Sequence, residues 1–438
     1  LTKLQFNITD DQDLRLSYTA NRSDGILYPA GPMDADYDDS DIYTLGYTIR
    51  ELGSLSKQLD LDYYYSKVDH PMSTKERNFF LNANPMMRNM YMTNHLKTSV
   101  WGTTVKNSLD VGDSLVTVGL DTSVRNWRGG MYSTNINTGV TTPSDTNRMY
   151  STDTTNKAVF TKIEKSFGAL DLEAGMRYDY TDIETQRPNV DDNKYSSLNG
   201  YVFGAYNIDD ESKVFAGIGK SSRVPDAREL YQQTTASNPN LEDTKNYEAD
   251  LGFEKTIGSF FIKPKIFYSE LKDYIYNSGS FENIDAKIYG LDVSGFYYLT
   301  EDLSFDYGVA YLKGKKDGKY TGNDKDLAEI TPLKANFAVN YEYAKSKFKA
   351  EVIAVDRWDS YDASAKEQEL AGYAVVNLKY TQALFKHFEV TLGVDNLFDK
   401  VYNSTNTYQD ITYVEVAGDR VLFNDPGRYG YVNLKYSF

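Results

Sequence analysis

The chain has no cysteine in its 438 residues and only 11 prolines. Without cysteine it can form no disulfide bond, no thiolate metal site and no cysteine nucleophile. The sequence also has no run of about twenty apolar residues, the length that a membrane-spanning helix needs. Its longest apolar runs, such as Val352 to Val355, are much shorter. Disulfide-stabilised folds and membrane-spanning helices are therefore excluded for these residues.

Positive charge is also scarce. The chain has 47 Lys and Arg residues against 63 Asp and Glu residues, a formal net charge of −16. A nucleic-acid partner is not expected, because phosphate binding requires a basic surface. The sequence lacks a Gly-rich phosphate loop, a His-Glu-x-x-His helix and a Gly-x-Ser-x-Gly turn, and its only histidines are His70, His95 and His387. We therefore expect no enzyme activity, no catalytic site and no resident cofactor.

Aromatic residues are abundant, with 38 tyrosines, although the mean hydropathy is only −0.56. This combination is typical of a membrane β-barrel, whose strands alternate lipid-facing with lumen-facing residues. Period-two alternation recurs along the chain and is clearest at its end. There the apolar set is Val432, Leu434, Tyr436 and Phe438, and the intervening set is Tyr431, Asn433, Lys435 and Ser437. The sequence predicts an all-β fold, a transmembrane antiparallel β-barrel formed by residues 1–438 as one domain.

Short connections alternate with long polar stretches. The short ones are interpreted as periplasmic turns: Asp10 to Asp13, Gly53 to Ser56, Val111 to Asp113, Asp209 to Glu211, Gly258–Ser259 and Thr300 to Asp302. The long ones are interpreted as extracellular loops near 22–41, 66–96, 126–157, 181–197, 221–246, 313–332, 356–372 and 399–428. This division gives roughly nineteen strands, whereas a single-chain bacterial barrel has an even number. We therefore expect an odd number of strands before Leu1.

Four segments carry a family pattern, in a fixed order: Arg223 to Tyr231, Asn238 to Glu248, Asp395 to Asp399, and Pro426 to Phe438. They resemble the TonB-dependent outer-membrane receptors. The resemblance implies a bacterial outer-membrane protein with about 22 strands, so that about three would precede Leu1. It also implies an N-terminal plug that fills the barrel and uptake driven by the TonB complex.

The resemblance implies several partners. No counterpart of the plug or its TonB-contacting box occurs in this sequence, so we expect the plug domain to be absent here and TonB to be reached through it. The terminal aromatic residue Phe438 resembles the signal that the barrel assembly machinery reads. Outer-membrane lipid and a monomeric state complete the expectation. The four segments themselves are expected to shape corners between strands and loops, whichever substrate enters.

Within that family, Tyr28 to Tyr43 and the His70-Pro71-Met72 segment resemble the copper-receptor branch. That branch places a His-x-Met pair on the barrel opposite Cys and Met ligands from the plug, and His70 and Met72 match the barrel half. Imidazole and thioether are the soft donors that suit Cu(I). Residues i and i+2 of an extended chain share a face, so both could reach one ion. Copper is the expected transported ligand.

The next segment supplies weaker metal-ligand candidates: Met86, Met87, Met90, Met92 and His95. Methionine also fills apolar gaps, so a packing role stays open. Met131 and Met149 fall in a different predicted loop and are expected to take no part. An acidic run, interpreted as a loop, could bind Ca²⁺ or simply be solvated: Asp34, Asp36, Asp38, Asp39 and Asp41.

Other functions remain open. An importer of a siderophore, cobalamin or another metal chelate would grip an organic ligand with aromatic and arginine side chains and would not need soft donors. A passive porin or adhesin would have no plug. An outer-membrane enzyme is the least expected class, because His387 lies beside a predicted periplasmic turn and only two other histidines are present.

Overall fold

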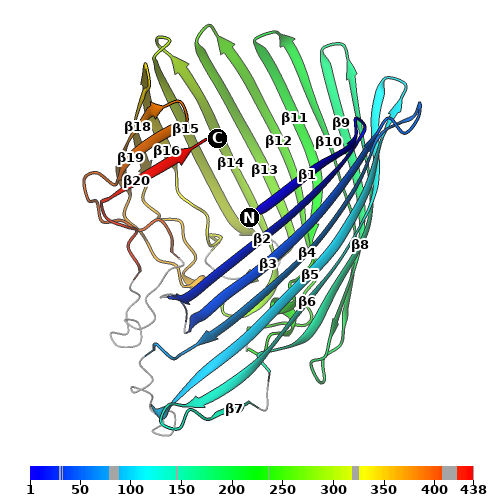
Figure 1. The fold of residues 1–438 in the computed structure, drawn as a ribbon, viewed down its shortest axis with the longest axis vertical. Coiled ribbons are helices and arrows are strands. Elements are labelled where there is room, and N and C mark those ends of the chain that lie inside the picture. The colour runs from blue at the N-terminus through cyan, green and yellow to red at the C-terminus, as the bar shows by residue number, and fades with distance from the viewer. Residues whose placement is uncertain are drawn as a thin grey trace.

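A computed structural model describes residues 1–28, 31, 33–77, 88–144, 147–234, 236–317, 325–406 and 422–437. These residues form one antiparallel sheet of 20 strands that curls around a central space (Figure 1). No helix in the described part of the chain is long and apolar enough to cross a membrane. The prediction of an all-β antiparallel barrel is confirmed.

The strand bounds follow chain order: β1 (Thr2–Thr9), β2 (Gln12–Ile26), β3 (Asp34–Arg50), β4 (Ser56–Ser73), β5 (Met90–Val111), β6 (Ser114–Asn135), β7 (Thr141–Pro143), β8 (Met149–Phe167), β9 (Leu170–Thr185), β10 (Asn193–Asp209), β11 (Ser212–Arg223), β12 (Thr244–Ile257), β13 (Phe260–Asn277), β14 (Phe281–Tyr298), β15 (Leu303–Asp317), β16 (Lys334–Tyr343), β17 (Ser346–Val355), β18 (Tyr373–Phe385), β19 (Phe388–Asp395) and β20 (Tyr429–Tyr436). Two short helices lie in connections: α1 (Ala227–Tyr231) and the 3₁₀ turn η3 (Ala363–Ala365).

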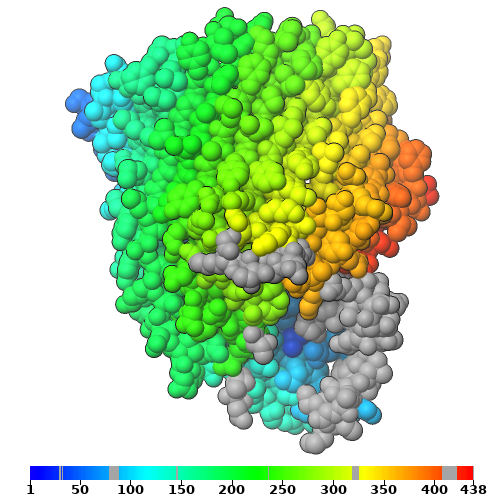
Figure 2. Space-filling view, turned by 180° about the vertical axis from the view of Figure 1, so that it is seen from behind, coloured from blue at the N-terminus to red at the C-terminus, as the bar shows by residue number. Residues whose placement is uncertain are grey.

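The wall itself has nineteen strands, because β7 is a three-residue addition beside β6, which also pairs with β8. Each wall strand pairs with its neighbours in sequence, so the sheet is a simple meander. The strand number predicted from the sequence is therefore correct. Figure 2 shows from behind that the middle strands, green to yellow, form a continuous wall.

The sheet has two free edges among the described residues. β1 pairs only with β2, and β20 pairs only with β19. Every residue of both strands is exposed, and the two edges are the dark blue and red strands of Figure 1. The expectation of further strands and a plug before Leu1 stays a prediction.

The two faces of the wall differ chemically because successive side chains alternate. On β4, Leu61 and Tyr63 point to the outer face and are exposed. The intervening Asp60 points to the inner face, where it is buried and accepts a hydrogen bond from Thr48 at 2.8 Å. An apolar outer face and a charged inner face are the arrangement of a barrel in lipid around a polar lumen.

The barrel has a turn end and a loop end. All the predicted short turns join strands at one end, the top of Figure 1. His387 lies in a further short turn, between β18 and β19. The long connections gather at the other end, the loop end. The predicted loop bounds were too wide, since β2 continues to Ile26, β3 begins at Asp34 and β4 continues to Ser73. Beyond the apolar band both faces of a strand meet water, so the alternation that marks a strand fades.

The acidic run is part of this correction. Asp34 to Asp41 belong to β3, paired with β4, and do not form a loop. The pairing with β4 shifts register between Ala35 and Asp39, so the alternation of faces is interrupted within the run.

Candidate functional site

His70 and Met72 lie on β4 near the loop end of the barrel. They share the inner face with Asp60, because all three occupy even positions of one regular strand. Across the strand pair, His70 lies opposite Leu96 and Met72 lies opposite Asn94 of β5. The predicted pair therefore faces the lumen from one spot on the wall.

The imidazole of His70 is mostly enclosed, with 22% of its side chain exposed. Its Nδ1 is buried, has no hydrogen-bond partner among the described residues and lies 3.6 Å from Asp38 Oδ2. The ring of Tyr28 packs edge-on against it at 6.3 Å between centroids. His70 thus presents a ring nitrogen without a hydrogen-bond partner beside a carboxylate, a setting that favours a cation.

Asn94, the cross-strand partner of Met72, has two further methionines as neighbours. Its Nδ2 donates a hydrogen bond to the sulfur of Met33 at 3.3 Å, and Met131 of β6 is its cross-strand partner. Met33 was not predicted as a candidate ligand, although it lies inside the Tyr28 to Tyr43 segment. Its contact with Asn94 depends on the path of the loop between β2 and β3. Met131 was wrongly assigned to a separate loop. Its position on β6 puts it two strands from the His70 pair, with Asn94 of β5 between them.

Met92 and Met90 continue the inner face of β5 beyond Asn94. The backbone of Met92 bonds to Thr74, two residues after Met72, with N–O distances of 2.9 and 3.0 Å. Ser133 donates a hydrogen bond to the sulfur of Met90 at 3.8 Å. The inner face at the loop end therefore carries one imidazole and several thioethers. Met86 and Met87 lie outside the described residues.

His95 points the other way. It occupies an odd position of β5, so its ring lies on the outer face, where Nε2 is 2.5 Å from Asp69 Oδ1. Asp69 also binds Lys97 Nζ at 2.8 Å and accepts a hydrogen bond from Tyr37 at 3.3 Å. The structure therefore does not bring His95 together with His70 and Met72. Met149 of β8 is buried in a core against which Leu96, the cross-strand partner of His70, packs.

The acidic run does not converge on one point. Within the described residues no group of three or more His, Cys, Asp or Glu side chains is arranged to hold a metal ion. The aspartates contact several different side chains instead: Asp34 contacts Arg77, Asp36 contacts Ser73, Asp38 contacts His70, and Asp39 and Asp41 share Arg22. The geometry gives the Ca²⁺ interpretation no support.

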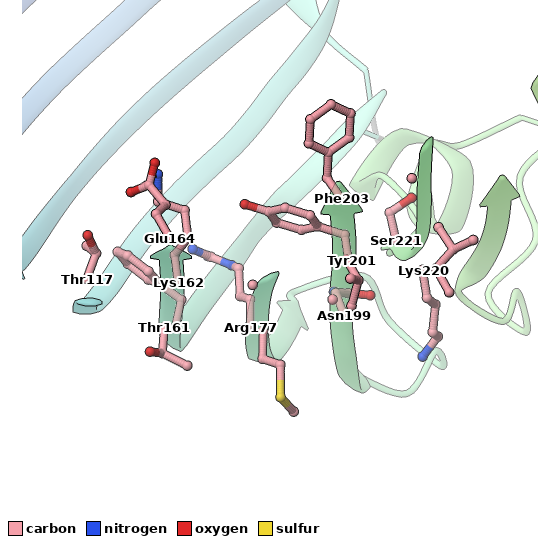
Figure 3. Close-up of a pocket in the computed structure, with 18 of the residues that line it drawn as sticks. Thr117, Thr161, Lys162, Glu164, Arg177, Asn199, Tyr201, Phe203, Lys220 and Ser221 are labelled. Carbon is pink, nitrogen blue, oxygen red and sulfur yellow. The ribbon is translucent and has the colours of Figure 1, made fainter. Parts of the chain in front are cut away.

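The inner wall is polar farther from the mouth as well. A depression of about 870 Å³ is bordered by β4 to β6 and by β8 to β12. Figure 3 shows Glu164, Arg177, Tyr201 and Phe203 projecting from one side of the sheet, while Thr161 and Lys220 project from the other. Arg177 pairs with Asp121 at 3.1 Å and with Asp179 at 2.9 Å. These paired charges suit a wetted lumen.

Comparison with known proteins assigns the family. The family model described as "TonB dependent receptor-like, beta-barrel" matches residues 2–397. The chain belongs to the TonB-dependent receptor β-barrel family. Members of this family are receptors and transporters, and the barrel lies in the outer membrane.

Two curated relatives show how far the similarity extends. The chain is 29% identical over 246 residues to the vitamin B12 transporter BtuB of Photobacterium profundum, covering 52% of this chain and 38% of the relative. It is 26% identical over 315 residues to the ferric enterobactin receptor of Pseudomonas aeruginosa, covering 61% of this chain and 40% of that relative. The matched region therefore spans well under half the length of either relative.

Solved structures confirm the fold. The copper transporter OprC matches with a TM-score of 0.88 at 20% identity, covering 100% of this receptor chain and 71% of that chain. The FrpB iron transporter from Neisseria meningitidis matches with a TM-score of 0.76 at 14% identity, covering 100% of this chain and 71% of the transporter chain. At such identities the likeness concerns the fold alone.

In this receptor the Arg223 to Tyr231 segment forms a corner on the inner wall. Asp226 caps α1, and the Glu229 side chain accepts from the Asp226 backbone N–H to complete a capping box. Asp226 also pairs with Arg125 of β6 at 2.5 Å. Tyr231 is fully buried in a cluster with Ile183 and other inward residues. The segment therefore fixes a loop to the wall.

The other three segments are also held by hydrogen bonds between distant parts of the receptor. Leu241 is buried, and its carbonyl accepts a hydrogen bond from the Tyr195 hydroxyl at 2.8 Å. Asn396, at φ 50°, donates from Nδ2 to the carbonyls of Lys400 and Pro426 at 2.8 and 3.3 Å. These contacts support the structural roles expected for the segments.

A second buried cluster anchors the receptor's loop between β17 and β18. Asp362 pairs with Lys316 of β15 at 2.5 Å, and both side chains are fully buried. Burial opposes the charge on Asp362, but hydrogen bonds from Lys316, Tyr276 and Ser364 outweigh it and lower the pKa of Asp362 below its usual value. Burial raises the pKa of Glu367, whose carboxylate accepts the backbone N–H of Asp362 and of Glu329. Two loops are thereby tied to the wall.

Proposed function

We propose that the receptor imports copper through a site to which the barrel contributes His70 and Met72. The observation that carries this proposal is their common inner face at the extracellular, loop end, with Met33, Met92 and Met131 on the neighbouring positions. Soft sulfur and imidazole donors select Cu(I) over hard divalent ions. A protein of the same fold whose structure has been solved is named a copper transporter, which agrees with this choice.

The proposal includes the partners of the whole protein. A plug domain would supply the remaining copper ligands and would contact TonB, whose energy drives release into the periplasm. The barrel assembly machinery would insert the barrel through its last strand, which ends at Phe438, a residue outside the described ones. Outer-membrane lipid surrounds the wall, and the receptor acts as a monomer.

The test uses the full-length receptor with His70→Ala, Met72→Ala and the double substitution. Each single change should weaken copper binding at least tenfold, because even loss of an outer-shell partner costs a metal site about 10–100-fold in affinity. Bound copper is measured by elemental analysis after purification under reducing conditions. Met176→Ala is the matched control, since Met176 is 55% exposed on the outer face of β9.

A second candidate is import of a metal chelate such as a siderophore or cobalamin. Its support is that the curated relatives bear the names of a vitamin B12 transporter and a ferric enterobactin receptor. Growth of a deletion strain under copper limitation separates the two. A growth defect supports copper import. Unchanged growth, together with wild-type copper content in the double mutant, would favour the chelate.

A further inference from the structure

The outer face of the receptor has a hollow far from the His70 pair. It is an apolar groove of about 690 Å³ across β8 to β13. Its walls are outward side chains that are each about half exposed: Ile163, Met176, Val202, Ile218, Tyr247 and Tyr268. A groove in the lipid-facing wall of a membrane protein must be filled by lipid, because water is absent there.

Small residues create the groove. Gly200, Ala174 and Ala249 form its floor on three strands of the set. Gly200 leaves no room for a larger residue on its own strand pair, since an added Cβ would lie 2.8 Å from the carbonyl oxygen of Gly175. The close approach of the β9 and β10 backbones therefore requires glycine at position 200, and this keeps the floor of the groove free of a side chain there.

A lysine stands at the rim of the groove. Lys220 lies opposite Gly200 on one side and opposite Tyr247 on the other, and its ammonium donates a hydrogen bond to the carbonyl of Leu198 at 2.8 Å. Figure 3 shows Lys220 on the side of the sheet away from Tyr201 and Phe203. It is therefore an outer-face residue in contact with the membrane.

Lys220 differs from most lysines on the surrounding strands because it forms no salt bridge within the described residues. Lys265 pairs with Asp250 at 2.7 Å, for example, and Lys213 pairs with Glu254 at 2.9 Å. Glu270 also lines the groove, but it pairs with Lys272 at 2.8 Å. The positive charge of Lys220 is thus left for a partner outside the chain.

The position of Lys220 along the barrel axis, relative to the membrane boundary, indicates the kind of partner. Tyr247, Tyr268 and Tyr289 form an outward row, and such aromatic rows mark the boundary between hydrocarbon and headgroups. β11 runs from Lys220 directly into the long loop that begins after Arg223, so this boundary is the extracellular one. We propose that the groove binds an acyl chain of an anionic lipid of the outer leaflet, whose phosphate, with no cationic group attached, is held by Lys220.

The test measures lipid binding to the detergent-purified, full-length receptor by native mass spectrometry. The probes are phosphatidic acid and phosphatidylcholine with identical acyl chains. We expect phosphatidic acid to bind about fivefold more tightly than phosphatidylcholine, the effect of one basic side chain at a charged membrane surface. Lys220→Gln should abolish this preference. Lys287→Gln is the matched control, because Lys287 lies on β14 and pairs with Asp317.

A groove-filling substitution tests the acyl chain separately. Ala249→Phe places a large side chain on the floor of the groove and should weaken binding of both lipids, with heat-modifiable migration on a gel confirming that the variant is folded. A preference for phosphatidic acid that survives Lys220→Gln would overturn the proposal. Undiminished binding of both lipids by folded Ala249→Phe would overturn it equally.

Discussion

The most tightly enclosed charges in the described chain are Lys316 and Asp362, whose side chains are wholly buried. Removing one partner of such a pair leaves an uncompensated charge out of water, which costs about 3–5 kcal/mol. Asp362→Asn should therefore release the loop at residues 356–372. The measurement is the rate of limited proteolysis in this loop, which should rise by at least tenfold.

The control for Asp362→Asn comes from the same loop. Arg357 and Glu369 form a pair at 3.1 Å, but their side chains are 64% and 51% exposed. Exposed pairs contribute about 0–1 kcal/mol, so Arg357→Ala should change the cleavage rate little. Equal rates for the two variants would show that the buried pair does not hold the loop.

At the scale of the strand and its connection, the fold makes a topological prediction. Residues 136–144 follow β6 at the extracellular end, whereas Gly112–Asp113 joins β5 to β6 at the periplasmic end. The chain has no cysteine of its own, so introduced thiols can be read without background. Asn137→Cys should react with a membrane-impermeant maleimide on intact cells, and Asp113→Cys should react only after lysis. Labelling of Asp113→Cys on intact cells would contradict the topology.

Elements could be predicted where lipid and lumen impose opposite demands on alternate residues. Under that condition the period of two appears directly in the sequence, and it predicts the strand number and the short turns. Near the loop end both faces are wet, so the strand residues Asp34 to Asp41 were assigned to a loop. His95 was grouped with His70 for the same reason, since spacing within a supposed loop cannot tell which face of a strand a ring takes.

Prediction of the candidate site had a similar limit. His70 and Met72 were predictable because two soft donors at i and i+2 share a face whatever the loops do. Met33 was not, because its contact with Asn94 joins residues 61 positions apart through an irregular segment. Such contacts depend on how a loop folds over its strands, which alternation does not encode.

For the whole molecule, the unpaired edges of β1 and β20 determine whether residues 1–438 can stand alone. An open edge in hydrocarbon leaves backbone N–H and C=O groups without partners, at several kcal/mol each. Residues 1–438 refolded in detergent should therefore not show the heat-modifiable gel migration of a closed barrel. A shift equal to that of the full-length receptor would mean that the two edges pair with each other.

Adjacent residues of strand β4 face opposite sides of the wall and make different contacts. His70 faces the lumen, while Asp69 beside it faces outward and binds three side chains from two adjacent strands. Inserting or deleting a single residue within β4 would exchange these faces along the rest of the strand. During evolution, the length of such a receptor can therefore change freely only in its loops. Changes in chain length can therefore alter ligand specificity only through the loops at the extracellular mouth. In the strands, the alternation of inward and outward residues has to be kept.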